Sequence, residues 1–168
     1  MDALRRTFAR LLPRRLAAGL AVGLVGALVG GLGCTSSEER LEVDTASIQA
    51  ALEVYLPRLG QAYATGELAP LEGLAAQKEI AAIEKRISDL AGQGRIIEPT
   101  FRGLTIEDVK VFNYANAYVT TVEIWDLRSL STGAREVLAE EIGQRDRVKY
   151  QLKREGDSWK VLFRAKQE

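Results

Sequence analysis

Residues 16–33, LAAGLAVGLVGALVGGLG, form a run without charged side chains, and this run most constrains what the chain can fold into. Five arginines precede it, and Cys34 and the polar sequence TSSEER follow it. A basic start, an apolar centre and a boundary of small residues are typical of an export signal. The run is also just long enough to cross a bilayer as a helix. We therefore assign residues 1–33 to an export signal peptide or a membrane anchor, and expect the remaining chain to be exported.

The only cysteine, Cys34, lies directly behind this run. Leu32-Gly33-Cys34 resembles the lipobox of bacterial lipoproteins, in which a signal peptidase cuts before the cysteine and the thiol receives a diacylglyceryl group. Gly31 departs from the pattern, because the family usually has an aliphatic residue there. The resemblance implies a lipid at Cys34, and Thr35 in place of an aspartate implies an outer-membrane lipoprotein facing the periplasm. A retained inner-membrane helix is the alternative.

Arg5 and Arg6 begin the sequence RRTFAR. This resembles a twin-arginine export motif, with an arginine pair, a hydrophobic residue two positions on and a further basic residue. The general export route is the alternative, since a second pair, Arg14-Arg15, lies closer to the apolar run.

Composition excludes several kinds of chemistry. The chain has no histidine and one cysteine, so it lacks the commonest general base and the usual zinc ligands. We predict no metal and no cofactor. Five of 23 basic residues but only one of 23 acidic residues lie in 1–33, which leaves 18 basic and 22 acidic residues in 34–168. A mildly acidic body argues against a nucleic-acid partner.

Residues 34–46 are small, polar and charged, and we interpret them as a tether ahead of a domain that covers 47–168. Apolar residues then recur at helical spacing from Ile48 to Tyr63, although Pro57 is expected to kink or split this helix. A second helical pattern runs from Leu71 to Leu90. The sequence thus predicts two or three helices.

After residue 95 the period changes to two, which indicates strands. The expected strands are 104–114, 117–128, 145–154 and 158–165. Residues 130–144 fit either a short helix or an extended excursion between strands, and we favour the excursion because Thr132-Gly133 and Gly143-Gln144 bracket it as turns. Helices followed by antiparallel strands predict the α+β class, with the helices packed on one face of a curved sheet of about four strands.

This order, with AYVTTVEIWDLR in the middle and RVKYQLKREGDSWKV at the end, resembles the nuclear transport factor 2-like, or cystatin-like, α+β cone. The closing hairpin most resembles exported or membrane-tethered domains of plastid-division and bacterial envelope proteins. The resemblance implies a curved sheet that wraps the helices and a pocket between them. It implies no single activity, because the superfamily includes isomerases, dehydratases and plain binding domains.

Glu123 is the main candidate for a catalytic group. It would share a strand face with Val119, Thr121, Trp125 and Leu127. If that face is concave, its carboxylate lies beside an indole in an apolar pocket, as a general base would. If the face is instead convex, Glu123 is solvated, and alternation does not decide between the two.

The end of the chain is basic, with eight basic and four acidic residues in 145–168. In a paired hairpin these cations would share an outer face, either as a solvated surface or as a site for an acidic protein or anionic lipid headgroups. The candidates for pocket or partner contacts are Tyr118, Trp125, Arg147, Lys149, Lys160 and Arg164.

Together these patterns predict a non-enzymatic, membrane-tethered binding domain of the cell envelope, for a protein partner or a small ligand. Its partners would be the membrane, an envelope protein or a second copy in a homodimer. The alternative is a lyase or isomerase of the same fold that uses an acidic residue, Glu123 or Asp126, in the cone pocket.

Overall fold

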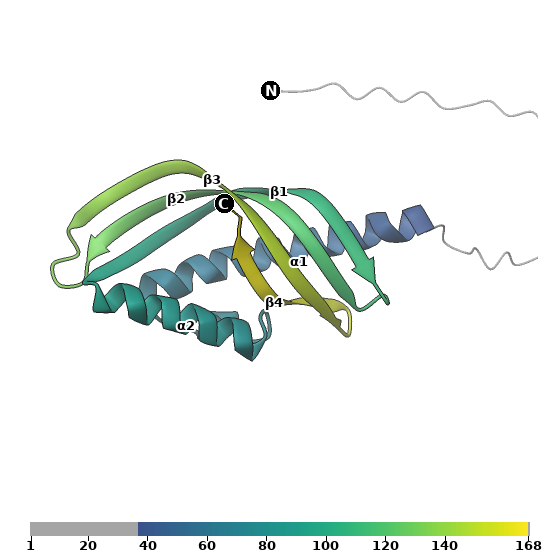
Figure 1. The fold of residues 1–168 in the computed structure, drawn as a ribbon, viewed down its shortest axis with the longest axis horizontal. Helices are drawn as coiled ribbons and strands as arrows, with labels where there is room; N and C mark the ends of the chain where they lie inside the picture. The colour runs from purple at the N-terminus through teal and green to yellow at the C-terminus, as the bar shows by residue number, and fades with distance from the viewer. Residues whose placement is uncertain (1–36, 168) are drawn as a thin grey trace, which may run out of the picture. The chain divides into compact units, whose positions relative to one another are not determined.

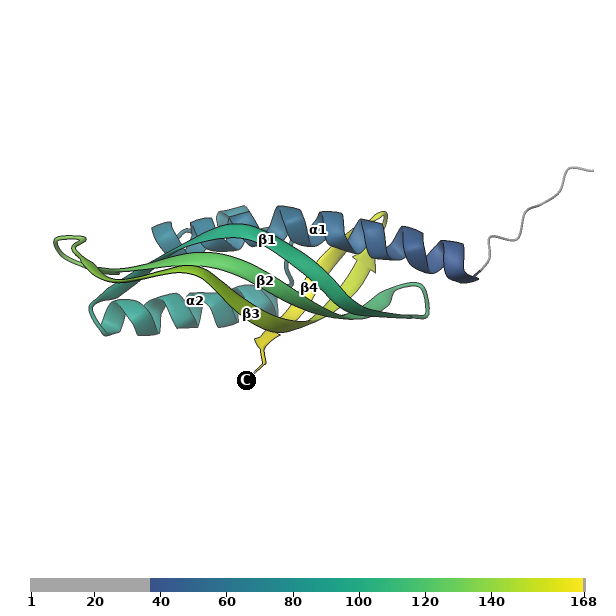
Figure 2. The same cartoon turned by 90° about the horizontal axis from the view of Figure 1, so that it is seen from above.

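The computed structural model describes residues 37–167 (Figure 1). Its elements are α1 (Ser37–Thr65), a short 3-10 helix η1 (Ala69–Leu71), α2 (Gln77–Gly92), β1 (Arg95–Phe112), β2 (Asn116–Ser131), β3 (Val137–Glu155) and β4 (Ser158–Lys166). The strands form one antiparallel sheet in the order β1-β2-β3-β4, which arches over α1 and α2 (Figures 1 and 2). The predicted α+β class is confirmed. Arg5, Arg6, Cys34 and the proposed export signal lie outside the described residues.

Helix α1 begins at Ser37, so most of the segment that we interpreted as a tether is helical. An ion pair between the buried Asp44 and the half-buried Arg154 joins this first part of the helix to β3. The Arg154 guanidinium also lies 4.6 Å from the centroid of the Trp159 ring, and Trp159 Nε1 donates to Ser47 Oγ at 2.9 Å. The folded body therefore starts ten residues earlier than 47, because a polar contact with the sheet holds a helix start that has little apolar periodicity.

Pro57 lies inside α1 without splitting it. Proline removes one backbone hydrogen bond from a helix interior. Around it, Leu52, Leu56 and Leu59 are buried in the core. Tertiary packing of an apolar face supplies most of the stability of a protein helix, so this burial offsets the lost bond.

One hydrophobic core lies between the helices and the concave face of the sheet. Helix α1 contributes Ile48, Leu52, Tyr55, Leu56 and Leu59, and the strands contribute Val119, Trp125, Val148, Tyr150, Leu152, Trp159 and Val161. Within residues 37–167, neither α1 nor α2 carries an apolar stretch long enough to cross a bilayer.

Residues 130–144 form a hairpin rather than a helix. Strand β2 continues to Ser131 and β3 begins at Val137. The Ser131 backbone N–H donates to the Glu136 carbonyl at 2.9 Å, and the Glu136 N–H donates to Ser131 Oγ at 3.0 Å. Extended chain, the alternative we favoured, is what forms here.

Irregular pairing bends the sheet around the helices. The register shifts around Arg102 in β1 and around Asp126 between β2 and β3. Opposite Asp126, Gly143 has φ 68°, a left-handed conformation that suits glycine. Asp126 accepts hydrogen bonds from the Gly143 backbone at 2.8 Å and from Arg102 Nε at 2.6 Å, which holds the bulge together. Bulges of this kind increase local bend and twist.

A further bulge reverses the alternation of β4. Gln151 pairs with Phe163 but Leu152 pairs with Val161, so Leu162 is the extra residue. As a result Phe163 turns outward and Arg164 turns inward. Our expectation that Arg164 lies on the outer basic face is wrong, because strict alternation does not allow for an inserted residue.

Candidate functional site

Glu123 lies on the concave face of β2. Its side chain is fully buried, and Thr121 and Trp125 on the same face are buried beside it, while Tyr118 on the other face is 53% exposed. The face of β2 that contains Glu123 is therefore the concave one, which alternation in the sequence did not decide. The carboxylate lies next to the Trp125 indole, as the concave alternative required.

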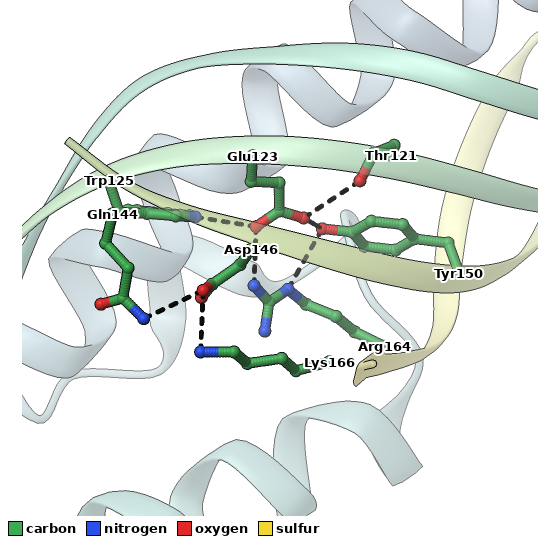
Figure 3. A network of polar contacts seen from close by, with 8 residues as sticks. All are labelled: Thr121, Glu123, Trp125, Gln144, Asp146, Tyr150, Arg164 and Lys166. Carbon is green, nitrogen blue, oxygen red and sulfur yellow. Dashed lines mark hydrogen bonds and ion pairs between the residues drawn. The ribbon is translucent and has the colours of Figure 1, made fainter. Parts of the chain in front are cut away.

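Four side chains donate hydrogen bonds to the Glu123 carboxylate (Figure 3). Arg164 Nη2 contacts Oε2 at 2.7 Å, and Trp125 Nε1 contacts the same oxygen at 2.8 Å. The Tyr150 hydroxyl and Thr121 Oγ1 contact Oε1, the latter at 3.5 Å. A carboxylate with this many donors, one of them cationic, is held as an acceptor and has no free oxygen for a substrate proton.

Arg164 is the only cation in direct contact with that carboxylate among the described residues, and its side chain is 15% exposed. Burial alone would lower the pKa of the guanidinium, but Tyr150 and Glu123 beside it raise that pKa above its usual value. Arg164 Nε also donates to the Tyr150 hydroxyl at 3.1 Å. Burial, helped by Glu123, raises the pKa of Tyr150, so this hydroxyl stays protonated as a donor.

A second polar group lies beside the first (Figure 3). The Asp146 carboxylate accepts a hydrogen bond from Gln144 Nε2 at 2.9 Å and pairs with Lys166 Nζ at 2.7 Å. Sequence reasoning missed these residues. The only signal available was that Gln144 and Asp146 precede Val148 and Tyr150 at a period of two.

A further buried acid, Glu79, lies in the first turn of α2. Burial raises the pKa of its carboxyl, against the opposing influence of Arg164 and Arg86. Burial likewise raises the pKa of the Tyr55 hydroxyl, and the nearby charge of Glu79 raises it further. Among residues 37–167, Glu123 is the acid that forms an ion pair with Arg164.

The mouth of the cone contains a cavity of about 410 Å³ between the helices and all four strands. Its apolar wall comprises Leu59, Tyr63, Leu90, Ile97, Pro99, Trp125 and Leu127. Its polar wall comprises Arg86, Gln144, Asp146, Arg164 and Lys166. An apolar cavity of this size with a few convergent polar groups is typical of a small-molecule site. Glu123 does not line it, because Arg164 and Trp125 stand in the wall instead.

The arrangement is suited to binding more than to acid–base chemistry. The lining carboxylate Asp146 is paired with Lys166, and Asp126, the other acid considered from sequence, is bonded to Arg102 and Gly143 in the bulge. Within residues 37–167, no cluster of acidic or cysteine side chains is placed to hold a metal ion.

The other predicted partner-binding residues separate into two groups. Trp125 and Arg164 are in the cavity wall. Tyr118, Arg147 and Lys149 are exposed outside the cone, and Lys160 is half-buried. On that outer side Arg147 pairs with Glu107 and Lys160 pairs with Glu155, both at 2.7 Å.

No protein-family model matches the chain, and no curated protein matches it in sequence. Solved structures do match it. The intermembrane space region of the chloroplast protein ARC6 has a TM-score of 0.61 at 12% identity, over 72% of this chain and 94% of that one. A cystatin-like protein from Caulobacter vibrioides has a TM-score of 0.44 at 12% identity, over 73% and 87% of the two chains. An NTF2-like protein from Novosphingobium aromaticivorans has a TM-score of 0.41 at 16% identity, over 80% and 90%.

At these identities the likeness shows the fold alone. The body of the chain shares the fold of the ARC6 region, with two helices on a four-stranded antiparallel open sheet. The α+β arrangement predicted from the sequence is confirmed, and it assigns no activity.

Proposed function

We propose that the chain is a membrane-tethered extracytoplasmic domain that binds a small, uncharged and largely apolar ligand in the cone cavity. The observation that carries this proposal is the inward turn of Arg164 at the Leu162 bulge. Arg164 forms an ion pair with the Glu123 carboxylate, which could otherwise have acted as a base. The apolar cavity lies in front of this ion pair. Binding a ligand there needs no proton transfer.

The charges around the cavity favour an uncharged ligand. Arg164 is paired with Glu123 and Lys166 with Asp146, so each charge in these pairs already has its counterion. An added anion or cation would have to compete with a pair or remain unpaired in a partly desolvated site, which costs free energy. Arg86 is exposed at the rim, where water can solvate it.

The location rests on the N-terminal sequence. The apolar run 16–33 and the lipobox-like Leu32-Gly33-Cys34 support export and anchoring by a lipid or a helix. The ARC6 domain that shares the fold is itself described as an intermembrane space region. Mass spectrometry of the membrane fraction tests this part. A mature chain that begins at acylated Cys34 supports the lipid anchor, whereas an intact N-terminus supports a retained helix.

Ligand binding is tested with the neutral dye N-phenylnaphthylamine, whose fluorescence rises in an apolar site. We expect saturable binding by the unmodified protein. Leu90→Trp places a larger side chain in the cavity wall and should abolish the signal. Leu138→Trp, at an exposed position of β3, is the matched control and should bind like the unmodified protein.

Equal dye binding by both variants would place the dye elsewhere and overturn the cavity as the site. The enzymatic alternative is tested separately with Glu123→Gln in an isomerisation assay. Turnover by the unmodified protein that is lost in this variant would contradict a purely binding role.

A further inference from the structure

The convex face of the sheet exposes three aromatic side chains. Phe112, Tyr118 and Phe163 keep 45%, 53% and 51% of their surface exposed. The rings of Phe112 and Tyr118 meet edge to face, with centroids 5.6 Å apart. Tyr118 pairs in register with Gln151, and Gln151 pairs with Phe163, so the rings lie on one face. Exposed apolar surface gathered in this way marks an interaction site.

Cations lie among these rings. Lys110 is the register partner of Tyr118, and Lys149 and Lys153 lie two positions on either side of Gln151 on the same face. Lys149 has no ion pair within residues 37–167, whereas Lys110 is 3.5 Å from Asp108. The convex patch, as we define it, comprises Lys110, Phe112, Tyr118, Lys149, Lys153 and Phe163. Since residues 34–168 carry more acidic than basic side chains, this gathering of lysines is a local feature.

The aromatic end of the patch lies where α1 begins. The turn between β1 and β2 is at that end of the domain in both views (Figures 1 and 2). Two contacts also place this turn near the first part of α1: the Arg154 side chain pairs with Asp44 of α1, and the Arg154 backbone N–H donates to the Ala115 carbonyl in the turn at 2.7 Å. Three residues, Cys34 to Ser36, separate the apolar run from Ser37. Three extended residues span roughly 10 Å, so an anchored chain keeps this end close to the bilayer.

We propose that the convex patch binds the surface of the bilayer that anchors the chain, with its rings at headgroup depth and its lysines against anionic lipids. The inference rests on the tether in the proposed function but not on the cavity. Tyrosine rings favour the membrane interface, and phenylalanine rings on a peripheral surface bury at the boundary between headgroups and acyl chains. Each lysine near an anionic surface improves binding roughly fivefold. Two exposed acids share this face, and each already has a lysine beside it: Asp108 lies 3.5 Å from Lys110, and Glu155 lies 2.7 Å from Lys160.

The test uses the full chain in vesicles of phosphatidylcholine, with and without phosphatidylglycerol. A spin label is placed at Phe163→Cys in the membrane-purified chain, with Cys34 and its anchor retained, and the label's accessibility to a water-soluble relaxation agent is measured. The chain without Phe163→Cys reports any labelling of Cys34 itself. The control label is at Ala134→Cys, in the exposed turn between β2 and β3 at the opposite end. We expect protection of the first label only, and only with phosphatidylglycerol present.

The double variant Lys149→Gln, Lys153→Gln should lower the ratio of chains whose patch is on the bilayer to chains whose patch is in water roughly 25-fold. The matched control, Lys78→Gln with Lys85→Gln, removes the same charge from α2 and should change nothing. Co-sedimentation with vesicles reports the tether by itself, so its loss contradicts the proposed function. A chain that co-sediments with an accessible label at 163 overturns the convex patch. Protection in cell membranes but not in lipid vesicles would assign the patch to an acidic protein and also overturn it.

Discussion

Removing the arginine at the centre of the cone should expose the cost of burying Glu123. Arg164→Met deletes the 2.7 Å ion pair to Glu123 and the 3.1 Å hydrogen bond to Tyr150. Breaking a buried ion pair by removing one partner costs about 3–5 kcal/mol, because the other charge remains desolvated. Glu123 is fully buried, but Arg164 is 15% exposed, so water can reach part of the site. We expect a loss of about 3 kcal/mol in the free energy of unfolding.

The assay is equilibrium urea unfolding of residues 35–168, followed by tryptophan fluorescence. Adding Glu123→Gln to Arg164→Met should recover about 2 kcal/mol, since the amide is neutral and its oxygen still accepts a hydrogen bond. The control Arg147→Met breaks an exposed pair with Glu107 and should cost less than about 1 kcal/mol. A loss for Arg164→Met as small as that of the control, or no recovery in the double variant, would refute the reasoning.

Three further predictions test other parts of the structure. Asp44→Ala should cost about 1–2 kcal/mol, because it removes a charged hydrogen-bond partner from Arg154 but leaves the guanidinium 30% exposed to water. Glu53→Ala on the exposed side of α1 should change urea stability by less than about 0.5 kcal/mol, and equal effects would mean that the helix start is not docked. Gly60→Ala should destabilise the protein by about 1–3 kcal/mol, because the added Cβ would lie 2.8 Å from the Pro99 carbonyl oxygen. Gly92→Ala has open space around it and should stabilise α2. Thermal unfolding that changes in the same direction for both variants contradicts this packing. Glu79→Gln tests the raised pKa of the buried Glu79 carboxyl. Because this carboxyl favours folding when it is protonated, the unmodified protein should gain stability relative to the variant as the pH falls from neutral toward about 4.3. Parallel profiles of stability against pH for the two proteins would exclude the raised pKa.

Period and composition were enough to predict the fold class. The apolar stripe from Ile48 to Tyr63 and the alternation of Val148, Tyr150 and Leu152 report burial directly, and these residues are in or against the core. The start of α1 was missed because it depends on one long-range ion pair, Asp44 to Arg154, across 110 positions of sequence. No local pattern encodes such a contact.

The site was harder to predict because bulges decide its geometry. Glu123 and Trp125 were correctly singled out as neighbours on one face, but alternation alone did not say which face is concave. Arg164 was placed outside, since the extra residue at Leu162 leaves no mark in the sequence. A single inserted residue exchanges the two faces of a strand, so the identity of the cation inside the cone depends on register rather than on residue type.

The indole N–H resonances of the two tryptophans test the central claim most directly. Trp125 lines the cavity and donates to Glu123, whereas Trp159 donates to Ser47 at the other end of the core. In a titration of nitrogen-labelled protein with N-phenylnaphthylamine, binding in the cone should shift the Trp125 signal and leave the Trp159 signal in place. A shift of Trp159 alone, or of neither signal at saturating dye, would contradict a ligand site in the cone.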